Sequence, residues 1–466
     1  MSAYAATRVG GRLSAAVLCG AVCVAAVGLP GPLSAQSRGA APAAGSLPLA
    51  AAVEAALAHH PAPGAADAAR DAALAAVGEA QAARYPTLRL SGSAIQYEEP
   101  TLVTPLHGFV PASLPPFDTT VFQGTLGASY KLFDGGARGA RIEAAAQQAE
   151  GMAALRTATL QDLAARTVNA YLWVLTGAQV LAAQDQRLGA LASELGRARQ
   201  FQAAGRAAVV EVLRAEAAHA AATAERVRLA AALDVAERDL ARLVDVEVDS
   251  ARADRLVAVT LADTTLPDRA AVLTNARATS PALAHGRAQL AAAAAATGVA
   301  RGARWPDLGL FGNYTGWSDD AGHNALEWNA GAALAYPFFT GGAVSKGIER
   351  AEAGRRGAAE SLRLGTLQVE QDIDRALARC EQAHARVRSL ATAVLRFAEV
   401  VRIEQLSLAA GSGTQTDYLR SEADLLEARA GWAEARHGEM SARAELARIT
   451  GALDRAWIAR TLENEP

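Results

Sequence analysis

Three features of this sequence have residue types or spacing that chemistry could use. His59-His60 could supply two metal ligands, but a metal site needs more ligands at fitting spacing, and the 8 histidines are scattered along the chain. Cys380 lies in a helical stretch, which favours a small packing residue over a nucleophile. Phe133-Asp134-Gly135-Gly136 resembles a phosphate-binding loop in its glycines, but lacks the Gly-x-Gly-x-x-Gly spacing. We therefore predict no catalytic residue, no cofactor and no metal, and a protein that is not an enzyme.

The glycine loop is more informative as part of an internal repeat. Tyr130 to Gly136 recurs as Tyr336 to Gly342, 206 positions later, and Ala83 to Gly92 recurs as Ala303 to Gly312, 220 positions later. A period above 200 residues is far too long for a solenoid repeat, so the chain is predicted to consist of two domain-sized copies. The repeated glycines are expected to reverse the chain between a strand and a helix; they are Gly135, Gly136, Gly341 and Gly342.

Each copy is expected to contain short helices, two strands and then a long helical hairpin. Apolar and polar residues alternate along the strands, with aromatic side chains toward the strand ends. About 10 residues of such alternation is typical of membrane β-strands, but a half-buried sheet in a soluble sandwich alternates in the same way. The strands are predicted over 87–97, 120–133, 307–316 and 326–339, and the lipid-facing aromatics would be Phe122, Tyr130, Trp328 and Tyr336.

A proline-free stretch of helical character follows each glycine corner. It runs for about 65 residues, or ~100 Å at the rise of an α-helix, and a return helix follows. The hairpins are predicted over 137–244 and 343–450 as antiparallel, coiled-coil-like pairs. Their tips would be Gly205, Arg206, Gly411, Ser412 and Gly413, where the turn glycines are expected to supply positive φ.

The N-terminus reads as a secretory signal peptide, with Arg8 and Arg12 before an apolar run and a small-residue cleavage site at Leu33-Ser34-Ala35. Cys19 and Cys23 fall within it, which leaves one cysteine and no disulfide. The net charge of −3 does not favour nucleic acid as a partner. The predicted organisation is a signal peptide at 1–35, a linker at 36–46, repeats at 47–250 and 267–451 around a linker at 251–266, and a tail at 452–466.

Four strands cannot close into a barrel. An open sheet edge in lipid would leave backbone groups unsatisfied, at a cost of several kcal/mol each, and bacterial barrels have at least ~8 strands. If the strands span a membrane, the chain must oligomerise: two copies would give eight strands, and three copies twelve.

The ordered set of features, present twice, resembles the outer membrane efflux proteins, or TolC family. The features are the paired strands, the corner at Phe133 to Gly136 and the Gly-x-x-x-x-x-Asp-x-Leu tip that starts at Gly411; the resemblance spans about Leu47 to Gly451. It implies an α+β membrane protein of the cell outer membrane, a homotrimer with a 12-stranded β-barrel and a periplasmic α-helical barrel. It also implies docking onto a periplasmic adaptor (membrane fusion) protein and an inner-membrane efflux pump or ABC exporter. The adaptor contact would be the hairpin tips, Gly205, Arg206, Gly411, Ser412 and Gly413.

The resemblance further implies a periplasmic gate at the tip of the second hairpin. Asp417 matches the first of two aspartates that ring the aperture in the family, and Arg420 stands where the second would be. A ring of three Asp417 side chains would favour cations, whereas Arg420 would oppose this or pair with Asp417 of a neighbour. An Asp and an Arg three residues apart on a helix could equally be a solvated pair.

Three functions follow from these patterns. The first is an outer-membrane channel of a tripartite efflux or type I secretion system. The second is a periplasmic coiled-coil adaptor or scaffold whose strands form a soluble domain, and the third is a secreted enzyme. The two pairs of strands with exposed aromatics favour the channel over the scaffold, and the lack of a catalytic cluster disfavours the enzyme.

Overall fold

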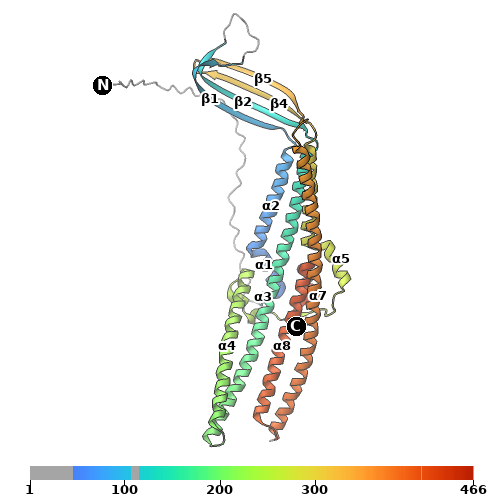
Figure 1. The fold of residues 1–466 in the computed structure, drawn as a ribbon. Helices are drawn as coiled ribbons and strands as arrows, with labels where there is room; N and C mark the ends of the chain where they lie inside the picture. The colour runs from blue at the N-terminus through green and yellow to red at the C-terminus, as the bar shows by residue number, and fades with distance from the viewer. Residues whose placement is uncertain (1–45, 106–114, 411, 465–466) are drawn as a thin grey trace, which may run out of the picture. The chain divides into compact units, whose positions relative to one another are not determined.

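The structure, a computed structural model, describes residues 46–105, 115–410 and 412–464 (Figure 1). The predicted signal peptide, all but the last residue of the 36–46 linker, and Gly411 lie outside these ranges. The first copy contains α1 (Leu49–His59), α2 (Pro61–Ala82), β1 (Thr87–Leu102), β2 (Phe117–Phe133), α3 (Ala137–Ala203) and α4 (Val209–Val244). The second contains α5 (Arg269–Thr279), α6 (Pro281–Gly302), β4 (Asp307–Asp319), β5 (Asn324–Ala335), α7 (Ala343–Ala409) and α8 (Gln415–Thr450).

The two helical hairpins have equal lengths. Both α3 and α7 have 67 residues, and both α4 and α8 have 36. At 1.5 Å per residue, the longer helices extend about 100 Å. None of the helices within the described ranges is long and apolar enough to cross a membrane.

The strands form one antiparallel sheet in the order β1-β2-β4-β5, so the two copies join through β2 and β4. The register places apolar residues in rows across all four strands, for example Leu90, Leu126, Tyr314 and Trp328. The neighbouring row, on the opposite face, is Ser91, Thr125, Thr315 and Glu327, in which the Thr125 and Thr315 hydroxyls lie 3.1 Å apart. The strands therefore have one apolar and one polar face.

The prediction that the fourth strand, expected over 326–339, continues to residue 339 is wrong. β5 ends at Ala335, whereas its counterpart β2 continues to Phe133. The two copies differ just after this point, because the residue equivalent to Lys131 of β2 is Pro337. Proline has no backbone N–H to donate to a strand ladder, so the pairing stops before it. Tyr336 consequently lies beyond the strand in which it was expected.

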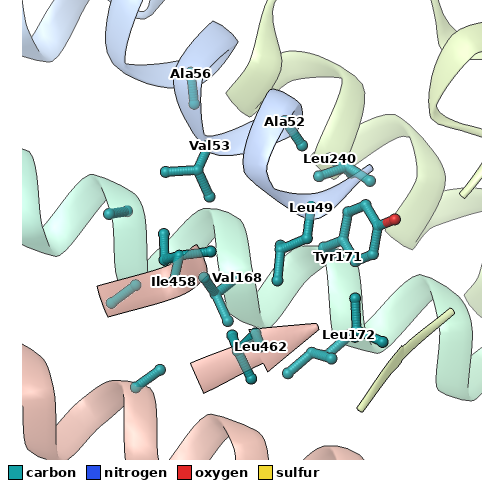
Figure 2. Packing of buried hydrophobic residues seen from close by; sticks show 14 of the residues in the cluster. Leu49, Ala52, Val53, Ala56, Val168, Tyr171, Leu172, Leu240, Ile458 and Leu462 are labelled. Atoms are coloured by element: carbon teal, nitrogen blue, oxygen red, sulfur yellow. The ribbon is translucent and has the colours of Figure 1, made fainter. Parts of the chain in front are cut away.

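The main hydrophobic core surrounds Tyr171, and Figure 2 shows how side chains from several segments meet there. Leu49 and Val53 of α1 and Leu240 of α4 are buried with it. The segments expected to be a linker and a tail also contribute to this core. They pair as β3 (Val259–Leu261) and β6 (Leu462–Asn464), next to α9 (Arg455–Thr461) and two short 3₁₀ helices at Val248–Ala251 and Ala253–Arg255.

Candidate functional site: hairpin tips and strand-to-helix corners

The tip of the first hairpin is a tight turn that glycine makes possible. Gly205 has φ +69°, a conformation that costs side-chain-bearing residues free energy. The turn is closed by hydrogen bonds from Gly205 N to Gln202 O (2.9 Å) and from Arg206 N to Phe201 O (2.7 Å). Gly205 therefore has the backbone role that the sequence predicted, and Arg206 is exposed beside it.

The second tip closes in a different way. The backbone N–H groups of Ser412 and Gly413 both donate to Ser407 O, each at 3.0 Å. The expectation of positive φ at Gly413 is wrong. Glycine is required there by close approach instead, because a Cβ on Gly413 would lie 2.9 Å from the Ser407 Cβ. Gly411 lies outside the described residues.

Asp417 takes part in the N-terminal cap of α8. The Thr414 hydroxyl accepts a hydrogen bond from Asp417 N (3.2 Å) and donates one to Asp417 Oδ2 (2.6 Å). This arrangement satisfies a backbone donor at the helix start and fixes the carboxylate near it, where the helix dipole favours negative charge. Arg420 is exposed one turn further along. Within one chain the two side chains do not form the solvated pair that was the alternative, since the ion pairs between described residues include neither Asp417 nor Arg420. The pairing of Arg420 with Asp417 of a neighbouring copy stays a prediction.

The equivalent start of α4 has no side-chain cap. Ala208 occupies the position of Thr414, and Glu211 occupies that of Asp417. The two tips share a cavity of about 600 Å³ whose lining includes Glu211 and Arg214 from the first hairpin and Thr414 and Thr416 from the second. Charges of both signs line it, so this cavity is not a concentrated acidic or basic site.

The four corner glycines all have positive φ, between +58° and +88°. Gly135 is also the most crowded of them, because a Cβ there would lie 2.5 Å from Gly302 O and 2.7 Å from the Trp305 Cβ. Arg138 also stabilises the first corner, because its Nη1 donates hydrogen bonds to Lys131 O (2.7 Å) and to Ala83 O (3.1 Å). Arg138 N donates to Asp134 Oδ2 (2.8 Å). These contacts tie the ends of α2, β2 and α3 together.

The apolar face of the sheet is uncovered in the single chain. Trp328 is 73 % exposed, and Phe122 and Tyr336 are also exposed, while Tyr130 is half-buried. Large aliphatic side chains on the same face are equally open to the surroundings, namely Leu88, Leu90, Leu126, Leu326 and Leu334. Contiguous exposed apolar surface of this kind marks a contact with lipid or protein.

A buried polar cluster joins the second hairpin to the segment between the copies. Arg443 Nη2 and His384 Nδ1 each lie 3.0 Å from Glu439 Oε1, and Arg443 Nη1 donates to Asp263 O (2.8 Å). Cys380 is fully buried near this cluster, and burial raises the pKa of its thiol. It is a packing residue, as expected. Among the residues that the structure describes, no three His, Cys, Asp or Glu side chains are grouped to hold a metal ion.

Four residues of these contacts are not indicated by the sequence patterns, namely Arg138, Tyr171, Glu439 and Arg443. The Tyr171 hydroxyl lies 2.8 Å from Leu47 O, Val257 O and Val257 N, and burial raises its pKa. Comparison of the two copies could have found two of these residues. Arg138 corresponds to Val344, and Tyr171 corresponds to Leu377. Where a polar residue in one copy corresponds to an apolar residue in the other, the polar side chain is expected to make a contact that occurs in one copy only.

The fold thus defines a class: a duplicated protein of paired strands and long antiparallel helical hairpins, with an uncovered apolar sheet face. Comparison with known proteins identifies the family. The sequence profile described as "Outer membrane efflux protein" matches residues 52–245 and 272–452, one segment for each copy. The chain belongs to the outer membrane efflux protein family. This is a family of transport channels and not of enzymes.

Individual relatives agree with this assignment. The chain is 32% identical to Protein CyaE of Bordetella pertussis over 312 residues, which are 65% of this chain and 64% of that protein. The alignment therefore spans less than two thirds of that relative. The fold is similar to the outer membrane protein VceC of Vibrio cholerae (TM-score 0.71, 22% identity, covering 86% of this chain and 96% of that one). It is also similar to the CmeC outer membrane channel of Campylobacter jejuni (TM-score 0.75, 15% identity, covering 88% and 86%).

Proposed function

We propose that this protein is the outer-membrane channel of a tripartite efflux or type I secretion system. In this proposal three copies form a passive duct. Their strands make a 12-stranded barrel in the outer membrane, and their hairpins form an α-helical barrel in the periplasm. A periplasmic adaptor protein and an inner-membrane pump or ABC exporter would deliver the substrate. Family membership supports the channel, and the sheet supports the assembly.

The observation that carries the proposal is the four-stranded sheet with two unpaired edges. Within the described chain, β1 and β5 each pair on one side only, and the apolar face is exposed. Open strand edges are unfavourable in lipid, because their N–H and C=O groups have no other partner there. Pairing β5 of one copy with β1 of the next would remove every edge once the ring closes.

The internal repeat predicts the register of that pairing. β2 pairs with β4 inside the chain, and Leu126 lies opposite Tyr314. The counterpart of Leu126 in β5 is Ala332, and the counterpart of Tyr314 in β1 is Ala94. The same shifts reproduce the pairings within each copy, since Ala94 lies opposite Phe122 and Tyr314 lies opposite Trp328. Ala332 should therefore face Ala94 of the neighbouring copy.

This register can be tested by disulfide cross-linking. Ala332→Cys and Ala94→Cys are introduced together in a Cys380→Val background, and the protein is oxidised in its membrane. We expect a covalent trimer on a denaturing gel. The matched control combines Ala332→Cys with Ser93→Cys, which points to the opposite face and should cross-link poorly. Covalent dimers alone would indicate an eight-stranded ring. A protein recovered from the periplasm without detergent, and not cross-linked, would favour the scaffold function instead.

The gate is proposed to lie at Asp417, with Arg420 as its neighbour. The support is the position of Asp417 at an exposed helix start, where three copies could bring three carboxylates together. Asp417→Ala should weaken the block of the reconstituted channel by divalent cations in planar bilayers. Glu211→Ala, the same position in the first hairpin, is the matched control and should leave the block unchanged. Equal effects of the two changes would contradict a gate specific to the second tip.

A further inference from the structure

The two strand-to-helix corners differ in a way that the channel function does not explain. At the first corner, Arg138 fills the junction and donates to the carbonyl oxygens of Ala83 and Lys131. The equivalent residue at the second corner is Val344, and the carbonyls that correspond to the two acceptors belong to Ala303 and Pro337. Val344 cannot donate a side-chain hydrogen bond, so the second corner lacks this brace.

A cavity of about 620 Å³ lies next to the second corner, between the junction of α6 with β4 and the end of β5. It is lined by two arginines, two aromatic residues, one proline and one leucine, which are Arg301, Arg304, Trp305, Pro306, Leu334 and Tyr336. Three sequence differences from the first corner shape it. Arg301 replaces Gln81, Leu334 replaces Ala128, and Pro337 replaces Lys131 and ends β5. These changes add a guanidinium and an aliphatic side chain, and they release Tyr336 from the strand.

The charges at this cavity are only partly compensated. Arg301 Nη2 donates to Glu352 Oε1 (3.0 Å), an exposed ion pair on the helix side of the cavity. Arg304 forms no ion pair with any residue in the described part of the chain, and its side chain is exposed. A guanidinium has five N–H donors in a planar fork that matches the oxygens of a phosphate. Arg304 therefore offers an open binding group for an anionic oxygen ligand.

An exposed apolar surface adjoins the cavity at Leu334. Leu334 is 68 % exposed and belongs to the apolar face of the sheet, and Phe338 and Phe339 beyond the strand are also exposed. Trp305 and Tyr336 line the cavity together with the two arginines. Tryptophan and tyrosine next to basic residues are typical of the boundary between lipid chains and water.

We propose that the second corner binds the phosphodiester headgroup of a phospholipid. The guanidinium of Arg304, with Arg301 beside it, would hold the phosphate oxygens, and Leu334 and the two phenylalanines would contact the acyl chains. The site would fix the depth of the sheet in the membrane at one end of β5. The inference rests on the proposed function, because it requires the sheet to lie in a bilayer.

The test compares lipid retention by purified full-length protein and its Arg304→Gln variant. Native mass spectrometry in mild detergent measures bound phosphatidylglycerol during titration with that lipid. Loss of a charge-assisted hydrogen-bonding pair should weaken retention about tenfold. Arg304→Lys should have an intermediate effect, because it keeps the charge but loses the fork. Arg350→Gln, an exposed arginine of α7 that does not line the cavity, is the matched control and should bind like the wild type.

Two results would overturn the inference. One is retention by Arg304→Gln equal to that of the wild type. The other is displacement of the lipid by an excess of inorganic phosphate, which would make the corner a simple anion site. The same preparations are examined in planar bilayers. If the wild type forms conducting pores and Arg304→Gln retains lipid as the wild type does, the lipid site is contradicted but the channel function is not. If the wild-type protein forms no pores, the channel function itself is contradicted.

Discussion

The equivalent short helices of the two copies, α1 and α5, pack in different ways against the long helix that follows them. In the first copy, Leu49 of α1 and Val168 of α3 are both buried, at 1 % and 0 % exposure, within the core around Tyr171. The equivalent residues in the second copy are Arg269 of α5 and Asp374 of α7. They form an exposed bidentate ion pair, in which Arg269 Nε and Nη2 donate to the two carboxylate oxygens at 2.7 and 3.0 Å.

The difference arises because the duplication is incomplete. The segment after α4 and the segment after α8 pair as β3 and β6, and they cover only the first docking site. Apolar residues stabilise the fold where such a cover excludes water. An ion pair is suited to a surface that stays exposed to solvent. Sequence equivalence between the copies thus does not imply equal environments.

The largest expected effect on stability comes from placing the second copy's aspartate, Asp374, at the equivalent position of the first copy, Val168. Val168→Asp would place a carboxylate in the covered core, where Leu49, the counterpart of Arg269, cannot pair with it. A buried unpaired charge costs about 3–5 kcal/mol, so the variant should lose a large part of its stability or fail to assemble. The measurement is urea unfolding of the detergent-solubilised protein, followed by helical circular dichroism.

Asp374→Val is the reciprocal change and serves as its control. It removes one partner of a solvated pair and should move the unfolding midpoint far less. Similar losses for the two variants would contradict the distinction between a covered and an uncovered docking site.

The second-largest expected loss of stability concerns Tyr171, whose equivalent in the second copy is Leu377. Tyr171→Phe removes the hydroxyl that links α3 to Leu47 and Val257 and leaves their buried backbone groups without that partner. The expected destabilisation is about 1–3 kcal/mol. Tyr314→Phe, with an exposed ring on the sheet, is the control and should be nearly neutral. An unchanged unfolding midpoint for Tyr171→Phe would show that the core does not depend on this link.

The third effect compares the hairpin tips. Thr414→Ala deletes the cap of α8 and should cost about 1 kcal/mol, whereas Ala208→Thr adds a cap to α4 and should stabilise it. Amide hydrogen exchange in the first turn of each helix measures the change locally. Faster exchange at α8 in the first variant and slower exchange at α4 in the second are expected. No change at either tip would contradict the assigned cap.

The smallest effect is the pH dependence of the Arg269–Asp374 pair. The hydrogen bond from Arg269 lowers the pKa of Asp374 below its ordinary value of 3.8. A carboxyl whose pKa is lower in the folded state stabilises the fold above its unfolded pKa, and this contribution is lost as the pH falls through the folded pKa. Arg269→Ala should therefore be slightly less stable than the wild type at pH 7, and the two should converge in acid.

Leu49→Ala, at the equivalent position of the covered site, is the control for that experiment. Its loss of stability comes from a cavity and should be larger and independent of pH over the same range. A difference between Arg269→Ala and the wild type that persists in acid would mean that the pair acts through packing instead of charge.

Much of the fold is predictable from the repeat and the residue periodicity. The helical hairpins, the strand pairs and the corner glycines all follow from local patterns, such as the alternation through Leu126 and the glycines at 135 and 136. The end of β5 was missed, although Pro337 is visible in the sequence, because the aromatic alternation continued past it. The role of Gly413 was also missed, since close approach to Ser407 depends on how the turn closes in space.

Local sequence patterns are enough to derive the two-copy architecture, the equal hairpin lengths and the apolar face of the strands, because periodicity and turn residues are local properties. Packing in three dimensions sets which docking site is covered, how Arg138 connects the elements at one corner, and which cavity lies beside Arg304 near the other. These features depend on contacts between segments far apart in the chain, such as β3 with β6. Residue spacing does not encode them, because a contact between distant segments is fixed by the packing of the whole core.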